Sequence, residues 1–85
     1  MLDVSTLTQQ QQQVYLHYYS QGITAKQLFK RLTDAWWMAN HAGFCDSMAG
    51  RLMAGESSDM IDDWQYACKH KYTIYSLCQI VEKLL

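Results

Sequence analysis

Residues 24–41 read TAKQLFKRLTDAWWMANH and carry the clearest helix signal in the chain. Thr24 and Gln27 form a capping-box pair, in which each side chain hydrogen-bonds the other residue's free backbone N–H at a helix start. From there, apolar residues recur at helical spacing along one stripe: Leu28, Leu32, Ala35 or Trp36, and Ala39. This segment therefore predicts a helix from residue 24 to about residue 41.

The aromatic residues of this segment predict that the helix has more than one neighbour. Phe29, Trp36 and Trp37 do not share one line, because adjacent positions of a helix diverge by about 100°. An apolar surface that wide exceeds the stripe that a single packing partner covers. We therefore expect some of the aromatic surface to meet a second element.

A first helix is predicted before this segment, from about residue 8 to residue 21. Thr6 and Thr8 are each followed three residues later by a glutamine, so either threonine could open the helix. Gly22 occupies the position that is typical of a left-handed helix stop.

A third and a fourth helix are predicted after the helix that ends near residue 41. Three Ala-Gly pairs punctuate the middle of the chain and leave a short helix from about residue 47 to 54, with Asp46 as its N-cap. The turn at Gly55 is followed by a helix that begins near residue 59. Aspartates in its first turns are stabilised by the helix dipole.

The apolar stripe of the last segment changes its phase near residues 69–71. Either one helix of about 26 residues turns different faces to different neighbours, or the chain breaks near residues 70–72. Residues 72–75 have strand propensity, but a lone strand would have no partner, so helix is favoured. Residues 1–85 are thus predicted to form a single all-α domain of four or five helices, orthogonal or bundle-like.

The composition agrees with a folded helical protein and restricts its functions. Hydrophobic residues make up 49% and charged residues 18%, a composition that is too apolar for a disordered chain. The chain contains no proline and lacks the regular turn signals that separate the strands of an all-β fold. The net charge of −1 disfavours nucleic-acid binding by bulk electrostatics. The charge is segregated, however, with +2 over residues 1–33, −5 over 34–63 and +2 over 64–85. An acidic middle therefore lies between two mildly basic ends.

The cysteines and the N-terminus predict a reduced, cytoplasmic protein. Cys45, Cys68 and Cys78 are an odd number with no paired framework, and the polar N-terminus lacks a signal-peptide pattern. The longest apolar run, residues 35–39, is far shorter than the roughly 20 residues that span a bilayer. We therefore expect no membrane partner.

Few residues carry a recognisable chemical signature. His41 with Cys45 and Cys68 with His70 could be metal ligands, but neither pair has the spacing of a structural zinc site. Cys45 is the one candidate nucleophile, and no base can be assigned beside it. With no phosphate loop or cofactor fingerprint, the sequence predicts neither an enzyme nor a bound metal or cofactor.

The aromatic and methionine content is the main functional indication. Eleven aromatic residues and five methionines exceed what a domain of this size readily buries, although a core built from most of them is the alternative. Tyr, Trp and Met are enriched in binding interfaces. We therefore expect a regulatory protein (an adaptor, inhibitor or transcription co-regulator) that binds another protein and self-associates. The predicted surface is centred on Trp36, Trp37 and Met38, with an acidic rim that steers a basic partner: Asp59, Asp62 and Asp63.

Residues 7–32 resemble the opening of a sigma-factor region 4 or LuxR-type helix-turn-helix domain. The shared frame is a capped helix, a glycine stop and a second capped helix: Leu7, Thr8, Val14, Gly22, Ile23, Thr24, Leu28 and Leu32. The resemblance ends at Leu32. It implies an alternative function, a dimeric DNA-binding transcription regulator in which Lys26, Lys30 and Arg31 contact phosphates.

Overall fold

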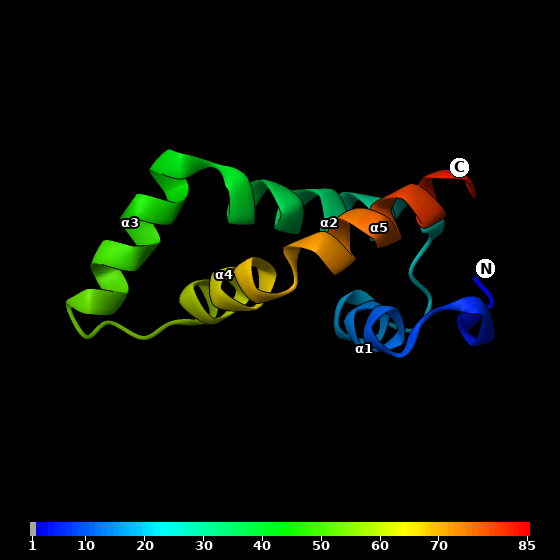
Figure 1. Cartoon of the computed structure of the whole chain (residues 1–85), viewed down its shortest axis with the longest axis horizontal. Coiled ribbons are helices and arrows are strands. Elements are labelled where there is room, and N and C mark those ends of the chain that lie inside the picture. The colour runs from blue at the N-terminus through cyan, green and yellow to red at the C-terminus, as the bar shows by residue number, and fades with distance from the viewer. Residues whose placement is uncertain (1) are drawn as a thin grey trace.

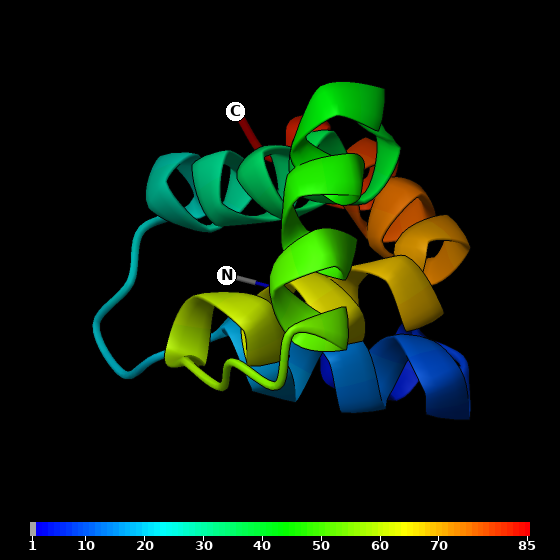
Figure 2. The same cartoon turned by 90° about the vertical axis from the view of Figure 1, so that its left-hand side faces the viewer.

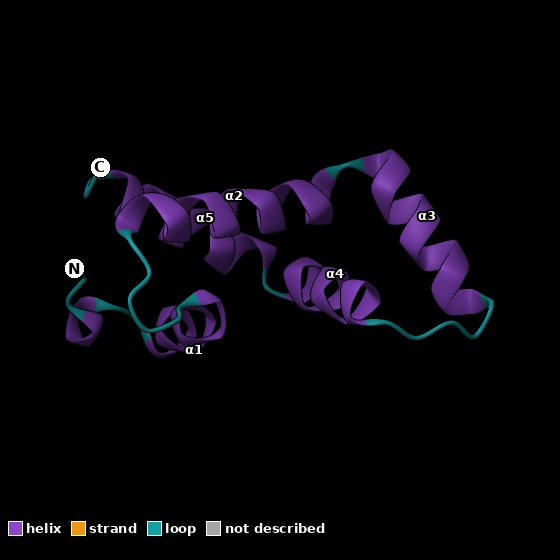
Figure 3. Cartoon of the chain, turned by 180° about the vertical axis from the view of Figure 1, so that it is seen from behind, coloured by secondary structure: helices purple, strands orange, loops and turns teal. Residues whose placement is uncertain are grey.

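The computed structural model describes residues 2–85 and is all-helical over that range. A 3-10 turn precedes five α-helices: η1 (Val4–Thr6), α1 (Gln9–Tyr18), α2 (Ala25–Asn40), α3 (Ala42–Met53), α4 (Asp59–Lys69) and α5 (Lys71–Glu82). The described residues contain no strand, which confirms the all-α prediction (Figure 3). None of their helices is long and apolar enough to cross a bilayer.

The helices form two layers that are joined at one end. α2 and α5 lie side by side along the long axis, and α1 and α4 lie beneath them (Figure 1). α3 stands at one end and runs from the α2 layer to the α4 layer, as the end-on view in Figure 2 shows. The molecule measures 42 × 22 × 19 Å. Helix α2 is its centre, because α2 contacts each of the other four helices.

The core between the layers is aliphatic. Its fully buried side chains come from all α-helices except α3: Val14, Leu28, Leu32, Ala67, Ile74, Leu77 and Val81. The apolar stripe of α2 predicted by its spacing supplies four of the buried residues, including Ala35 and Ala39. The stripe therefore faces the core as expected.

Capping boxes open both α1 and α2. Thr8 and Gln11 exchange side-chain-to-backbone hydrogen bonds of 3.1 and 3.0 Å, which decides between the two threonines that the sequence left open. Thr24 and Gln27 do the same at 3.1 Å. The predicted start of α2 is confirmed.

Helix α1 ends earlier than predicted, at Tyr18 rather than residue 21. Tyr19 is extended, and Gly22 adopts its left-handed conformation (φ 82°) in the turn that follows the helix. The reason is a long-range contact, because Arg31 Nη1 donates to the Tyr18 carbonyl at 3.0 Å and to Ser20 Oγ at 3.2 Å. This contact satisfies a carbonyl that the helix end leaves free.

Helix α3 begins at Ala42, so the predicted start near residue 47 is wrong, and Asp46 is not its N-cap. His41 both ends α2 and caps α3, with its Nδ1 accepting a hydrogen bond from the Phe44 backbone N–H at 3.2 Å. Gly43 therefore lies inside a helix instead of interrupting one.

The chain breaks at His70, which decides between one long final helix and two. Ser58 caps α4, and its Oγ accepts from the Ile61 N–H at 3.2 Å. The apolar stripe changes its helical phase at the boundary between the two helices, because α4 and α5 bury separate faces. Residues 72–75 are helical, as predicted.

Candidate functional site

An open groove of about 310 Å³ lies between α1, α2 and α4. We call it the central groove, and it is lined by two residues of α1, four of α2 and one of α4: His17, Tyr18, Arg31, Asp34, Ala35, Met38 and Asp63. These helices are distant in the sequence, so the groove exists only in the folded chain.

The inner part of the central groove is apolar and neutral. Ala35 is buried, and Met38 and Tyr18 are half-buried against the core. Burial raises the pKa of Tyr18 far above its usual value, with smaller contributions from Tyr66 and from the negative charge of Asp63. The Tyr18 hydroxyl therefore stays protonated at neutral pH and can donate a hydrogen bond.

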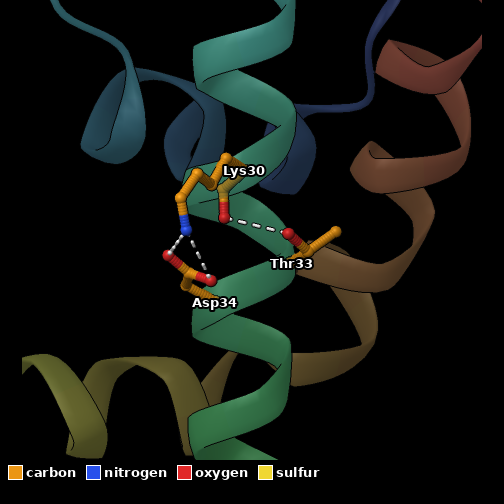
Figure 4. Close-up of polar contacts among 3 residues, drawn as sticks. All are labelled: Lys30, Thr33 and Asp34. Atoms are coloured by element: carbon orange, nitrogen blue, oxygen red, sulfur yellow. Dashed lines mark hydrogen bonds and ion pairs between the residues drawn. The ribbon is translucent and has the colours of Figure 1, made fainter.

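The rim of the central groove carries two exposed carboxylates from different helices. Asp34 Oδ2 accepts from Lys30 Nζ at 3.1 Å, and the Thr33 hydroxyl on the same turn donates to the Lys30 carbonyl (Figure 4). This pair is largely exposed, so it contributes little stability and opens readily. Within the described part of the chain, no hydrogen bond or ion pair engages the Asp63 carboxylate. Both carboxylates are thus accessible to a cation.

A stack of aromatic rings joins α1 to α4 beside the central groove. The His17 and Tyr66 rings are nearly parallel, with centroids 3.6 Å apart, and the Tyr66 ring also meets His70 at 4.3 Å. Burial lowers the pKa of His70, with further lowering by the charges of Lys69 and His17. This lowering of the pKa favours the neutral form of His70.

The predicted surface at residues 36–38 is not one patch in the folded chain. Trp36 lies against Tyr75 of α5, with ring centroids 5.0 Å apart. Trp37 is 50% exposed and stacks on His41 at 4.5 Å. Met38 lines the central groove on a third side of α2. The three side chains diverge because successive residues of a helix point about 100° apart.

The predicted acidic rim lies in the first turns of α4, and its three members have different surroundings. Asp59, Asp62 and Asp63 are all exposed, as expected for charges near a helix N-terminus. Only Asp63 lines the central groove. Sequence reasoning missed the second carboxylate there, Asp34, although it belongs to the acidic block of the chain.

The three cations of the DNA-binding alternative lie in the first half of α2. Lys30 pairs with Asp34, and Arg31 is held at the end of α1. Lys26 is exposed one turn earlier. Helix α2 continues through Leu32 to Asn40 without a turn.

Lys30 and Arg31 also line a second open cavity, of about 380 Å³, which we call the loop hollow. The loop between α1 and α2 forms its other side, and its full lining is Ser20, Gln21, Gly22, Ile23, Gln27, Lys30, Arg31 and Asp34.

The candidate metal and nucleophile residues are engaged in packing. Cys45 Sγ accepts from Trp64 Nε1 at 3.4 Å, and its thiol donates to the Met38 carbonyl at 3.2 Å. Burial raises the pKa of Cys68, with a smaller contribution from Cys45, which hydrogen-bonds it. Residues 2–85 contain no group of three or more metal-ligating side chains. The hydrogen bonds of Cys45 thus fasten α3 to α2 and to α4.

Comparison of the chain with protein families, curated proteins and solved structures found no match.

Proposed function

We propose that the protein is a small, non-enzymatic cytoplasmic regulator that binds another protein in the central groove. The observation that carries the proposal is the pairing of an apolar floor, Ala35 and Met38, with carboxylates on two separate helices, Asp34 and Asp63. A partner segment with an apolar side chain next to a lysine or arginine matches both features.

Charge outside the central groove favours the same partner. Residues 34–63 carry a charge of −5, and the other two acidic residues at the start of α4, Asp59 and Asp62, are exposed. A surface of one sign raises the rate at which an oppositely charged partner arrives. The acidic middle of the chain would therefore steer a basic segment toward the groove.

Two side chains on α2 suit a binding role. Methionine is flexible and adapts to different apolar partners. Trp37 lies three residues after Asp34, so the two are neighbours on the surface of α2. Its half-exposed ring supplies aromatic area beside Asp34, and Trp is enriched in hot spots.

The alternative, a helix-turn-helix DNA-binding regulator, requires a recognition helix after a turn near Leu32. Helix α2 instead continues to Asn40. Two of the three candidate cations already have partners within the chain. We therefore rank DNA binding second and include it as an outcome of the test.

The test compares two double variants in a pull-down with nuclease. The groove variant is Met38→Ala/Asp63→Asn. The control variant, Met53→Ala/Glu82→Gln, makes matched changes outside the groove: it truncates an 88%-exposed methionine and neutralises an exposed carboxylate at the end of α5, outside the acidic block of residues 34–63. Both variants are first shown to be helical by circular dichroism.

We expect a protein that is captured by wild type and the control variant but lost with the groove variant. Cross-linking should place a lysine or arginine of that protein, next to an apolar residue, in the groove. Equal capture by both variants would show that the groove is not the binding surface. Capture that nuclease abolishes would favour the DNA-binding alternative.

We also propose that the chain self-associates. Several large apolar side chains are more than half exposed: Leu16, Met53, Met60, Tyr72 and Leu85. Sedimentation equilibrium over a range of concentrations tests this, and a constant monomer mass would refute it.

A further inference from the structure

The central groove and the loop hollow share two lining residues, Arg31 and Asp34, so they are contiguous along α2. We propose that they form one binding track for an extended segment of the partner protein, with a lysine or arginine at the α4 end and an aspartate or glutamate at the loop end. This inference rests on the proposed function and adds the charge order of the partner.

The charge of the track reverses along its length. At the loop end, Lys30 and Arg31 outnumber Asp34. At the α4 end, Asp63 joins Asp34, and these two carboxylates outnumber Arg31. Because Arg31 and Asp34 line both cavities, the reversal comes from Lys30 at one end and Asp63 at the other. A partner of uniform charge would match one end and be repelled at the other.

The loop end fits a carboxylate. Lys30 is tied to Asp34 by an exposed ion pair that a second carboxylate can share. Gln27 uses its Oε1 to accept from the Thr24 N–H, which leaves its amide N–H groups free to donate. One monoanion balances the single excess positive charge of this end, whereas a phosphate dianion would exceed it.

The track has the length of a short extended segment. From Gln27 to Met38, α2 rises about 16 Å, the length of about five extended residues. The apolar floor of the central groove, formed by Ala35 and Met38, then receives one apolar side chain of the segment.

The test uses three blocked synthetic peptides of one composition. Two have segregated charges, Lys-Lys-Leu-Ser-Glu-Glu and its reverse, because the chain direction in the track is open. The third alternates the charges, as Lys-Glu-Leu-Ser-Lys-Glu. Binding is followed by NMR titration of the labelled full chain up to millimolar peptide. One segregated peptide should bind about two- to five-fold more tightly than the alternating one, the ratio that one or two exposed ion pairs give.

Charge variants assign the two ends. Lys30→Met should weaken the better segregated peptide about two- to five-fold, and should have no effect on a version with Gln in place of Glu. Asp63→Asn should weaken both versions. Lys26→Met removes the same charge one turn earlier, outside both linings, and should change neither.

The outcomes separate this inference from the proposed function. If all three peptides perturb the groove residues equally and Lys30→Met has no effect, the charge order is wrong and groove binding stands. If no peptide perturbs the signals of the residues that line the groove, both proposals are wrong.

Discussion

Replacing Thr24 by alanine tests whether the capping box of α2 stabilises the fold. The Thr24 hydroxyl accepts from the Gln27 backbone N–H at 3.1 Å, and Gln27 Oε1 accepts from the Thr24 N–H at 3.1 Å. Alanine at an N-cap lowers the free energy of unfolding by about 1 kcal/mol, because an N–H of the first turn loses its acceptor. Leu28, the residue after Gln27, is fully buried, so fraying of this turn would also expose core.

The expected effect is large enough to measure. In a domain of this size, about 1 kcal/mol corresponds to a shift in Tm of about 4–8 °C. Thr24→Ala should therefore unfold about 4–8 °C below wild type in thermal melts followed by circular dichroism. Thr24→Ser keeps the hydroxyl and should stay within about 2 °C of wild type.

Two results would refute this reasoning. Equal melting temperatures of Thr24→Ala and Thr24→Ser would show that the hydroxyl does not cap α2. Unchanged hydrogen exchange of the Gln27 amide in Thr24→Ala would show the same at the residue itself, since that N–H is the donor in the cap.

Three further predictions concern the pH response, the tryptophans and two glycines. The folded-state pKa of His70 is lowered below 6.5, so the contribution of this residue to stability is complete above pH 6.5 and is lost as the pH falls through the folded-state pKa. Urea titrations at several pH values should show this loss of stability. In His70→Gln the loss should be smaller. Trp36→Ala should destabilise the fold by about 1–3 kcal/mol, because the half-buried Trp36 ring packs on α5, whereas Trp37→Ala should cost less than about 1 kcal/mol. Equal losses of stability in chemical denaturation would contradict the different placement of the two rings. Gly50→Ala should raise Tm, because the added methyl group enters open space within α3. Gly55→Ala should lower Tm by several degrees, because Gly55 has a φ of 84°. Shifts of the same sign would be inconsistent with the backbone at Gly55.

Local patterns in the sequence predicted the helices whose ends depend on nearby residues. The Thr24–Gln27 box opens α2 where expected, and the phase change at residues 69–71, which was compatible with one helix or two, coincides with the break at His70. Both signals act within four residues of the helix boundary, so they are visible without tertiary structure.

The ends that were predicted wrongly depend on other contacts. Helix α1 stops at Tyr18, whose carbonyl accepts from Arg31, thirteen residues later in the chain. Helix α3 starts early because His41 caps it, a role that favours Ser, Thr, Asp and Asn in general. The Ala42-Gly43 pair and a possible N-cap at Asp46 suggested a later start, but the cap at His41 allows the helix to continue through Gly43.

The central groove was not predictable for a related reason. Helical periodicity gives the angles between side chains on one helix, and it correctly separates residues 36, 37 and 38 by about 100° each. It does not show which helix each direction faces. Met38 and Asp63 come together only because α2 packs against α4, and the stacking of His17 on Tyr66 has no signature in either helix.

Most aromatic side chains are neither fully buried in the core nor fully exposed on the surface. Tyr15 is the only buried aromatic side chain among residues 2–85, six are half-buried and four are exposed. The core is aliphatic, so most rings form a second layer at the helix edges, as Trp36 does against Tyr75 and His17 against Tyr66. A partner in the central groove would meet Tyr18 and Met38 in that second layer. The binding that we propose there would change side-chain rotamers in the second layer without rearranging the buried core on which the stability of the fold depends.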